Sequence, residues 1–369
     1  MKGPAGRRRA AAVYAAAALS LVYLGVTKLR PGRDPATRAD MTEAARLMVR
    51  ATAAIRDCRL AGGFPVDPAA DPNGTGLIGV ESSAVTTSAG RLEAKRTATN
   101  PDFAALAVSL LREAGARPGD AVAVGASSSF PGLIVATLSA ARVLGLEPLV
   151  ISSLGASEWG ANVPGFGWLE MEDCLRAAGL CDYAPVARSV GGEGDIGRDM
   201  DPAGRSGLEA RLRAGDAPFL EEPDLARNVA RRVALYRERA AGRRIAAFVN
   251  IGGSTANIGT SAEVLKLRPG LAGGVFVPPP GERGVLQVMA AEGVPVIHLL
   301  NIRGLCERYG LAWDPQPLPE PSAGPLYRRS GRGSRPPVLP TIGYVLAMAV
   351  LLRWGRMNKK NGNGPIFRD

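Results

Sequence analysis

Residues 121–152, AVAVGASSSFPGLIVATLSAARVLGLEPLVIS, decide the fold class. This stretch opens with a short apolar run at 121–124 and closes with a second one at 148–152. Between the two runs, Pro131 stands where a helix would begin and Gly145 stands where it would end. Two short apolar runs joined by a helical segment are typical of a βαβ unit, in which the two strands are parallel.

The same alternation continues on both sides of this stretch. Upstream we expect a strand at 77–80 and a helix at 101–114. Downstream, helices and strands are expected to alternate, starting with a helix, at 224–241, 245–250, 285–292, 295–299 and 302–309. Apolar strands that alternate with helices indicate a largely parallel sheet with helices on both faces. The predicted fold class is therefore α/β.

The distribution of charge argues against a nucleic-acid partner. The chain has 369 residues, of which 46% are hydrophobic, and this composition fits a folded protein of one or two domains. The formal net charge of +11 suggests a protein that binds polyanions. However, residues 1–38 carry +7 and residues 328–369 carry +8, which leaves −4 for residues 39–327. Because a polyanion-binding domain needs its positive surface on the folded body, we expect no nucleic acid as a partner.

Each basic end contains an apolar stretch. The first, at 10–27, follows three arginines and is not followed by a small-residue cleavage site, so we expect an uncleaved signal anchor that spans the membrane. For the second, at 338–354, two interpretations stay open, a second transmembrane helix and a buried terminal helix. The arginines before the first span favour a domain outside the cytoplasm at a bacterial inner membrane, although basic residues flank both sides of each span.

These features divide the chain into parts with different compositions. They are a basic tail (1–9), a transmembrane anchor (10–27), a helical or linker region (28–74), the α/β domain (75–326), a basic linker (327–337), a second transmembrane helix (338–354) and a polar tail (355–369). Within the α/β domain, residues 189–207 are rich in Gly and Asp and are expected to form a loop or lid between two halves. The four cysteines have irregular spacing and predict neither a disulfide pattern nor a redox compartment.

The turns after the expected strands are candidate ligand sites, because open α/β sheets bind ligands at the carboxyl ends of their strands. Three of these turns, at 125–132, 152–162 and 251–259, consist of small and polar residues. Glycine lets the backbone approach a ligand, and hydroxyls and helix N–H groups bind carboxylates and phosphates. For any single turn, tight glycine packing is the alternative. We predict a small anionic ligand, bound by Gly125, Ser127, Ser128, Ser153, Gly155, Ser157, Gly252, Gly253, Ser254, Thr255 and Asn257.

The first of these turns also has features of a nucleophile elbow. Residues 125–129, GASSS, stand between a strand and a helix but lack the last glycine of G-x-S-x-G. His298, the single histidine, follows the serines as it does in α/β hydrolases, and a structural histidine at a strand end is the alternative. A lysine could also activate a serine, and the body contains Lys95 and Lys266. The catalytic candidates are Ser127, Ser128, Ser129 and His298.

Residues 91–102 mix both charges with hydroxyls just before a helix. Two interpretations stay open for this segment: Lys95 and Arg96 bind an acidic group, or the segment is a solvated loop that ends in a helix cap. No metal site is expected, because the chain has one histidine and neither a C-x-x-C nor an H-E-x-x-H pattern. The turns match neither a P-loop nor a dinucleotide fingerprint, so no cofactor is predicted.

Several longer strings resemble the poly-gamma-glutamate system protein family. They are 79–108 (GVESSAVTTSAGRLEAKRTATNPDFAALAV), 124–146 (VGASSSFPGLIVATLSAARVLGL), 153–164 (SLGASEWGANVP), 191–198 (GGEGDIGR) and the turn at 250–259. The resemblance implies membership of a bacterial system that makes and exports poly-gamma-glutamate, an anionic capsular or secreted polymer, with an ATP-dependent amide ligase and small membrane partners. It supplies no catalytic residues, and this chain lacks the Walker signature expected of the ligase subunit.

Two hypotheses about function follow. The first is a membrane-anchored accessory component of poly-gamma-glutamate synthesis or export, which binds glutamate, a poly-gamma-glutamate end or the synthase subunits. The second is a serine-dependent hydrolase or transferase that acts on gamma-glutamyl chains. We prefer the first, because a single histidine and an incomplete elbow are thin support for catalysis. Whether the protein is an enzyme stays open.

Overall fold

The computed structural model describes residues 4–28, 33–328 and 338–356. The chain forms two units, one made of Met1–Gly32 with Arg332–Asp369 and the other of Arg33–Gly331. We call the second unit the body, because it contains the sheet. Helix α2 (Pro35–Ala61) also belongs to the body, so the structure joins most of the region 28–74 to the sheet domain.

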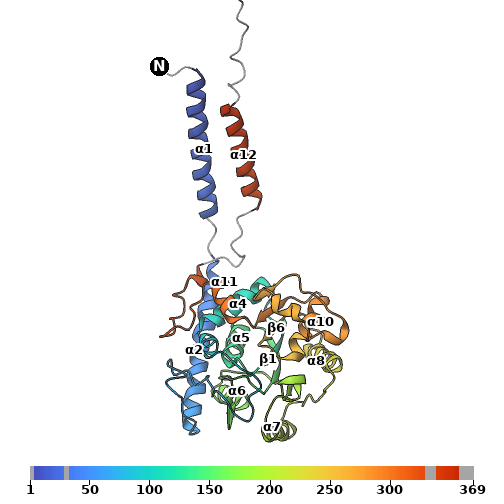
Figure 1. Ribbon diagram of the computed structural model, residues 1–369. Helices are drawn as coiled ribbons and strands as arrows, with labels where there is room; N and C mark the ends of the chain where they lie inside the picture. Colours follow the sequence, from blue (N-terminus) through green and yellow to red (C-terminus); the bar gives the residue numbers. More distant parts are fainter. Residues whose placement is uncertain (1–3, 29–32, 329–337, 357–369) are drawn as a thin grey trace, which may run out of the picture. The chain divides into compact units, whose positions relative to one another are not determined.

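The body is built on a six-stranded sheet with the order β5-β2-β1-β6-β8-β7 (Figure 1). Neighbouring strands are parallel except β7 and β8, which are antiparallel. The strands are β1 (Ala121–Ser127), β2 (Glu147–Ser153), β5 (Ala187–Ser189), β6 (Ile245–Ile251), β7 (Gly270–Ala272) and β8 (Val296–Leu299). A separate small sheet pairs β3 (Asn162–Val163) with β4 (Phe166–Gly167). The predicted α/β fold with a largely parallel sheet is confirmed.

Strand β1 lies in the interior of the sheet, between β2 and β6. Gly125 of β1 pairs with Ile151 of β2 and with Asn250 of β6, so the three strands end at the same edge. From β1 the chain builds outward through β2 to β5, and it then crosses back to build β6 and β8 on the other side. The direction of the connections reverses between β1 and β6, which is the position where open α/β sheets bind ligands.

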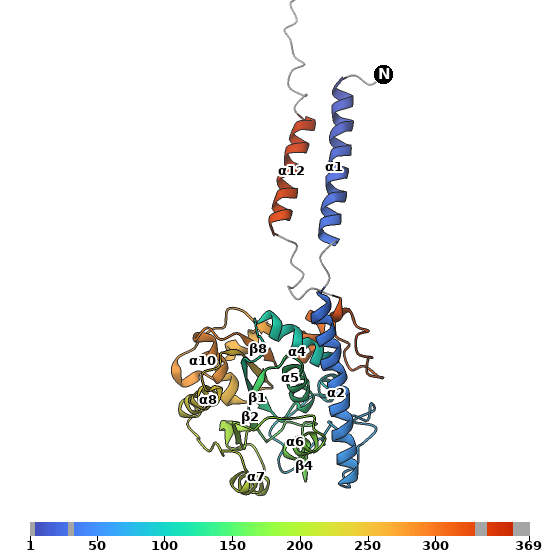
Figure 2. The same cartoon turned by 180° about the vertical axis from the view of Figure 1, so that it is seen from behind.

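Helices cover both faces of the sheet, as predicted (Figures 1 and 2). Val122 and Val124 of β1 pack in one apolar cluster with α2, α4 and α5, whereas Ala121 and Ala123 pack in a second cluster with α8 and α10. Successive side chains of a strand point to opposite faces, so an apolar strand contributes to both clusters. The covering helices are α4 (Asp102–Glu113), α5 (Pro131–Val143), α8 (Leu225–Ala240) and α10 (Val285–Ala291).

Local capping signals explain why the helix predictions agree closely with the structure. The Asp224 side chain accepts a hydrogen bond from the N–H of Arg227 at 2.9 Å where α8 begins, and Asn301 caps α11 (Ile302–Tyr309) through the N–H of Gly304 at 2.9 Å. The remaining helices of the body are α3 (Leu92–Thr97), α6 (Trp168–Ala177), α7 (Pro202–Ala214), α9 (Thr255–Ile258) and the short 3₁₀ helices η1 (Glu193–Asp195), η2 (Ala262–Lys266), η3 (Pro280–Glu282) and η4 (Pro325–Tyr327).

The strand prediction at 77–80 is wrong. This segment is largely buried but belongs to no sheet. The N–H of Gly79 donates to Trp159 O at 3.2 Å, and the N–H of Val80 donates to Asn162 Oδ1 at 2.9 Å. Its partners therefore come from the segment that follows β2 and not from the main sheet. An apolar run has the same composition whether it is a buried strand or a buried loop, so its pattern does not distinguish the two.

The smaller unit contains helices α1 (Pro4–Lys28) and α12 (Val338–Arg356), which lie side by side (Figures 1 and 2). The rings of Tyr23 and Tyr344 are stacked, with their centroids 4.4 Å apart. Two hydroxyl pairs add to this contact, Ser20 with Tyr344 and Tyr23 with Thr341, each at 2.9 Å. The two helices are thus joined by aromatic and polar contacts.

The prediction of transmembrane helices at 10–27 and 338–354 is overturned. Over the described ranges of the chain, no helix has both the length and the apolar character needed to cross a membrane. Alanine supplies much of the first stretch, and the second is short. The expected signal anchor, membrane partner and membrane location are corrected together with these helices. Several of the predicted parts lie partly outside the described residues. Among these are the tail 1–9 (residues 1–3), the basic linker 327–337 (residues 329–337) and the tail 355–369 (residues 357–369).

A disulfide connects α2 to α6, between Cys58 and Cys174, whose Cα atoms are 6.0 Å apart. Cys181 and Cys306 are buried free thiols. The two bonded cysteines are 116 residues apart in the sequence, so the bond closes a long loop of the unfolded chain. A cross-link of this length reduces the entropy of the unfolded state and stabilises the fold by about 2 to 5 kcal/mol.

We expect the double variant Cys58→Ala, Cys174→Ala to lose about 2 to 5 kcal/mol of unfolding free energy, because the unfolded chain regains its freedom. Chemical denaturation with and without a reducing agent measures this loss. Reduction should bring the wild type to the level of the variant and leave the variant unchanged. The control Cys181→Ala removes a buried thiol but no cross-link, so a reduction effect should persist in it. A wild type insensitive to reduction would contradict the stabilising role of the bond.

Candidate functional site

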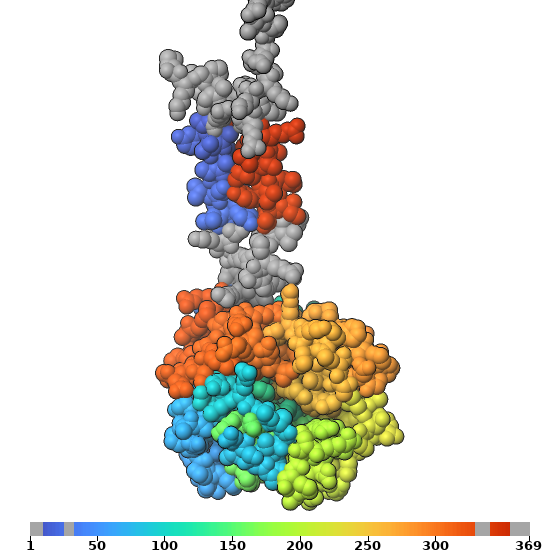
Figure 3. All heavy atoms as spheres, viewed as in Figure 1, coloured from blue at the N-terminus to red at the C-terminus, as the bar shows by residue number. Residues whose placement is uncertain are grey.

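The body contains a cavity of 670 Å³ at the carboxyl ends of its central strands. Its walls come from the turns after β1, β2, β6 and β8, from residues 87–95 and from residues 192–199. Figure 3 shows the segments before residue 100 (cyan), near residue 200 (yellow-green) and near residue 300 (orange) meeting around a hollow on one face of the body. The volume lies within the range of roughly 300 to 1,000 Å³ that is common for small-molecule sites.

The structure brings most of the predicted site residues to this cavity. The predicted residues that line it are Lys95, Ser127, Ser129, Ser153, Gly155, Ser157, Gly253, Ser254 and Thr255. They come from separate turns of the chain and meet because β1, β2 and β6 are neighbouring parallel strands. Several further lining residues were missed by sequence reasoning, among them Thr87, Ser88, Arg91 and Arg303.

Two of the predicted ligand-binding glycines are needed for packing. A Cβ atom on Gly125 would lie 2.6 Å from the side-chain amide of Asn257, and one on Gly252 would lie 2.9 Å from Ser127 Cβ. Gly252 also has a φ of 78°, a conformation that favours glycine. The tight-packing alternative therefore applies to both turns. Asn257 itself is fully buried, and its side-chain amide has no hydrogen-bond partner within the described part of the chain.

Ser128 and Arg96 do not line the cavity. The Ser128 hydroxyl is buried and donates to Ser153 O at 2.8 Å. Arg96 forms two hydrogen bonds with Asp314, one of them from Nε to Oδ1 at 2.8 Å. Lys95 alone of the basic pair reaches the cavity, because neighbouring residues of a helix point in directions about 100° apart.

His298 is not paired with any of the candidate serines. It lies in β8, where its Nδ1 is 3.0 Å from Asn250 Nδ2 of the neighbouring strand β6. Burial lowers the pKa of His298 to about 4, so the imidazole is neutral at neutral pH. The structure thus separates His298 from the cavity and gives it the surroundings of a structural residue within the sheet.

Lys95 is the buried cation of the cavity wall, with a relative exposure of 4%. Its Nζ donates to Ser129 O at 2.5 Å and lies 2.6 Å from Ser157 Oγ. The ring centroid of Phe130 is 4.0 Å from the same nitrogen. These contacts, all within the described residues, include no carboxylate. The lysine is therefore held by a carbonyl, a hydroxyl and an aromatic ring.

The surroundings of Lys95 change its protonation. Burial lowers its pKa to about 7, and the nearby charge of Glu158 offsets part of this effect. Desolvation acts in this direction because it penalises the charged ammonium more than the neutral amine. Near neutral pH, a substantial fraction of Lys95 is thus a neutral amine that can accept a proton. Strongly shifted lysines in cavities are common at functional sites.

The cavity serines form a connected set of hydrogen bonds. The Ser127 hydroxyl donates to Ser129 Oγ at 3.0 Å, and the N–H of Ser157 donates to the same oxygen at 3.0 Å. Ser157 Oγ is in turn the hydroxyl next to Lys95 Nζ. The turn after β1 and the turn after β2 are therefore linked through side chains, and Lys95 joins both of them to α3.

A buried ion pair supports the wall formed by residues 192–199. Arg232 Nη2 lies 2.6 Å from Asp195 Oδ2, and both side chains are almost fully buried. The other carboxylate oxygen of Asp195 accepts hydrogen bonds from Ser153 at 3.1 Å and from Ser189 at 2.8 Å, and Asn228 donates to Oδ2 at 3.0 Å. Burying two charges is costly, and good hydrogen-bonding geometry is needed to offset that cost.

Sequence reasoning missed this ion pair. Residues 189–207 were predicted to form a loop or lid; in the structure they run from the end of β5 through η1 into the start of α7, and the buried Asp195 within them has a φ of 62°. One signal was available: Arg232 follows Val229 by three residues and precedes Tyr236 by four, which places it on the apolar face of α8. A charge on such a face needs a partner, but the sequence does not say which carboxylate supplies it.

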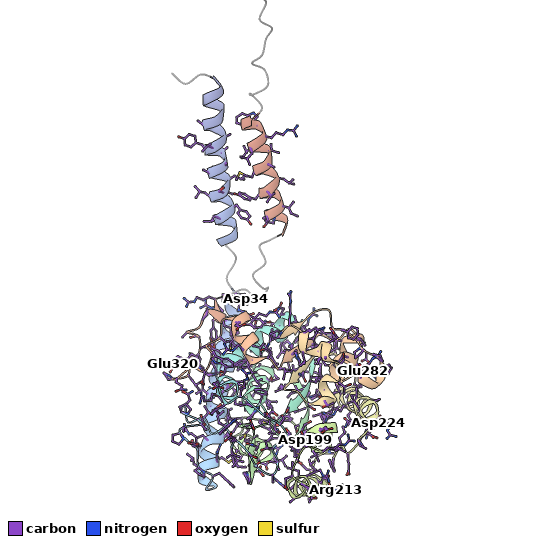
Figure 4. The ribbon with its side chains drawn as sticks, viewed as in Figure 1. Asp34, Asp199, Arg213, Asp224, Glu282 and Glu320 are labelled. Atoms are coloured by element: carbon purple, nitrogen blue, oxygen red, sulfur yellow. A yellow bond between two sulfur atoms is a disulfide. The ribbon has the colours of Figure 1, made fainter. Side chains whose placement is uncertain are left out.

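Both signs of charge are present among the exposed residues that line the cavity. Arg91 and Arg303 are exposed, and neither forms an ion pair among the described residues; Arg303 instead lies over the ring of Trp313, 4.4 Å from its centroid. Glu193 and Asp199 add carboxylates. Figure 4 shows Asp199 within the face of the body, away from its margins. The cavity can therefore pair with a ligand that carries both carboxylate and ammonium groups.

No metal centre is formed by the described residues, since they contain no group of His, Cys, Asp and Glu suited to hold an ion. No protein-family model matches the chain, and comparisons with curated proteins and with solved structures also find no match. The geometry of the cavity is therefore the main basis for a functional proposal.

The pKa of Lys95 predicts a pH dependence of stability. A lysine in an unfolded chain titrates near pH 10.4, so between about pH 7 and pH 10 the unfolded state binds more protons than the folded state. The contribution of Lys95 to the unfolding free energy should therefore rise with pH across this window, by on the order of a few kcal/mol. Below about pH 7 both states hold the proton, and the full desolvation cost applies.

Denaturation with urea at a series of pH values measures this effect. The difference in unfolding free energy between the wild type and Lys95→Met should show this rise, because nothing titrates at this position in the variant and the other titrating groups are common to both proteins. Lys266→Met is the matched control, because Lys266 is an exposed lysine paired with Glu263 at 2.5 Å. The control should keep the rise. An equal rise in Lys95→Met and in the wild type would contradict the assignment.

Breaking the Asp195–Arg232 pair should destabilise the body strongly. Arg232→Met leaves a buried carboxylate without its cation, which costs about 3 to 5 kcal/mol of unfolding free energy. Chemical denaturation measures this loss, and hydrogen exchange at residues 191–198 should rise with it. The control Arg237→Ala removes an exposed pair with Glu292 and should cost under about 1 kcal/mol. Equal losses in the two variants would refute the structural role of the buried pair.

Proposed function

We propose that the body binds the ends of gamma-glutamyl chains in the 670 Å³ cavity and that the protein is a component of bacterial poly-gamma-glutamate synthesis or export. The observation that carries the proposal is the convergence of hydroxyls, a buried lysine and two arginines at the point where the strand connections reverse; these arginines form no ion pair with any described residue. In open α/β sheets this is where ligands bind.

The chemistry of the ligand suits the residues that line the cavity. Each gamma-linked glutamate residue keeps a free α-carboxylate, and the residue at the amino end of the chain also has a free ammonium group. Arg91 and Arg303 can pair with carboxylates, and Glu193 and Asp199 can pair with the ammonium group. The cavity volume fits a few residues of a chain, so a chain end is favoured over a long stretch of polymer.

The resemblance to the poly-gamma-glutamate system protein family supports the same proposal. Its strings at 79–108, 124–146, 153–164, 191–198 and 250–259 contain most of the segments that line the cavity. Residues that resemble the family are thus gathered at one place in the fold. Synthase subunits of the system are the proposed protein partners, since they would supply the chain ends that the cavity holds.

Calorimetric titration of the purified protein tests the proposal. Short gamma-linked glutamate oligomers should bind in the cavity, and alpha-linked oligomers of the same length and charge should bind more weakly. The double variant Arg91→Ala, Arg303→Ala should lose at least about tenfold in affinity, because a hydrogen bond to a charged group contributes about 1.5 to 3 kcal/mol.

The matched control is Arg213→Ala, because Arg213 is exposed on α7 and lies at the margin of the body in Figure 4. This variant should bind like the wild type. A strain without the gene should make altered amounts or lengths of poly-gamma-glutamate, and the wild type but not the double arginine variant should restore them. Equal binding of both oligomer types, or of all variants, would refute a specific site.

A further inference from the structure

The hydroxyl nearest to the buried lysine belongs to the turn after β2. Ser157 Oγ is 2.6 Å from Lys95 Nζ, and Ser157 lines the cavity with a relative exposure of 7%. We infer that Ser157 and Lys95 form a serine–lysine pair that carries out acyl transfer, with Ser157 Oγ as the nucleophile and Lys95 Nζ as its base. A serine needs such an adjacent base because its hydroxyl is a weak nucleophile at neutral pH.

The contacts of Lys95 suit the role of a base. A hydrogen bond to Ser129 O at 2.5 Å fixes the position of Nζ, and the ring of Phe130 shields it from water. Since no carboxylate pairs with it among the described residues, the ammonium form is not strongly favoured over the neutral amine. Burial lowers its pKa to about 7, close to the value at which a general base works best at neutral pH.

Among the described residues, no base is hydrogen-bonded to the hydroxyls of the serines at 127–129, which the sequence predicted as nucleophiles. Ser127 and Ser129 are hydrogen-bonded to each other at 3.0 Å, and Ser128 donates to Ser153 O. Lys95 Nζ contacts Ser129 through the backbone carbonyl and not through the hydroxyl. The geometry thus favours a nucleophile in the turn after β2 over the candidates in the turn after β1. The hydroxyls of the first turn instead position the second, through the N–H of Ser157.

The cavity also offers a donor for the negative charge that develops on a carbonyl oxygen. Ser254 lines the cavity, and its hydroxyl is buried without a hydrogen-bond partner among the described residues. Such a hydroxyl can donate a hydrogen bond without first breaking another one, which is the property that an oxyanion donor needs.

In the proposed reaction, Lys95 carries one proton from the nucleophile to the leaving group. Ser157 Oγ attacks the carbonyl carbon of an ester or amide, and its proton passes to the electron pair of neutral Lys95 Nζ. The bond between the carbonyl carbon and the leaving oxygen or nitrogen breaks, and Lys95 returns the proton to that atom. Water or an acceptor amine, deprotonated by Lys95, then attacks the acyl–serine ester, and the proton goes back to Ser157 Oγ.

The assignment of the pair is independent of the substrate, whereas the natural substrate class rests on the proposed function. If the cavity holds gamma-glutamyl chains, the scissile bond is a gamma-glutamyl amide, with the arginines at the cavity holding its α-carboxylate. Water as acceptor shortens the chain, and an amine as acceptor transfers it. The test of the pair therefore uses a small neutral acyl donor that needs none of these charges.

The experiment is acylation of the full-length protein by p-nitrophenyl acetate, followed by mass spectrometry of the peptide that contains Ser157. The wild type should release p-nitrophenolate in a burst and carry an acetyl group on Ser157. The rate of the burst should rise with pH through a midpoint near 7, as Lys95 loses its proton. Ser157→Ala and Lys95→Met should each lose the burst by at least about a hundredfold.

Controls separate loss of chemistry from loss of fold. Lys266→Met should react like the wild type, since its lysine is exposed and is not among the residues that line the cavity. Circular dichroism and urea denaturation report whether Ser157→Ala and Lys95→Met keep the fold, and binding of gamma-linked oligomers is measured in parallel as the test of the proposed function. A folded wild type without acetyl–Ser157 between about pH 6 and pH 9, or a Lys95→Met variant that acetylates Ser157 as fast as the wild type, refutes the pair. Acylation without oligomer binding would retain the pair and refute the proposed function alone.

Discussion

The pairing of β1 with parallel strands on both sides is the constraint on which the architecture of the cavity depends. Each parallel connection returns the chain to the same starting edge of the sheet, so the turns after β1, β2, β6 and β8 all open at the opposite edge. Between β1 and β6 the connections run in opposite directions and leave a gap at this edge. The small side chains of these turns leave that gap open, and residues 87–95 and 192–199 form further parts of its wall.

The cost of burying a positive charge near this edge is met differently for Arg232 and for Lys95. An arginine stays charged at any accessible pH, so burying Arg232 requires a carboxylate, and Asp195 supplies it together with hydrogen bonds to Ser153 and Ser189. A lysine can lose its proton, so Lys95 tolerates burial with a lowered pKa, although no carboxylate of the described residues forms an ion pair with it. The first arrangement fixes the shape of the wall. The second leaves an amine with a lowered pKa in the cavity wall, in contact with Ser157 of the turn after β2.

The small residues of the turns serve two purposes that their composition does not distinguish. Gly125 and Gly252 make room for the side chains of Asn257 and Ser127, so they shape the layer beneath the cavity. Gly253, by contrast, lines the cavity, and a Cβ there would meet Leu300 at an ordinary contact distance of 3.6 Å. A cluster of glycine and serine thus marks the edge of the sheet where a ligand can bind, and the contacts of each residue separate packing from binding.

Local pattern was sufficient for the fold class, for most helices and strands, and for the turns that surround the cavity, because helix caps, apolar runs and parallel connections act over short distances in the chain. It failed at 77–80, where a buried loop has the composition of a strand, and at both ends, where apolar composition suggested membrane helices. It also failed to pair Ser157 with Lys95 and Asp195 with Arg232, which are 62 and 37 residues apart. Such pairs form only when strand order and helix packing bring distant segments within hydrogen-bonding range, and desolvation in that setting determines which groups keep their charge.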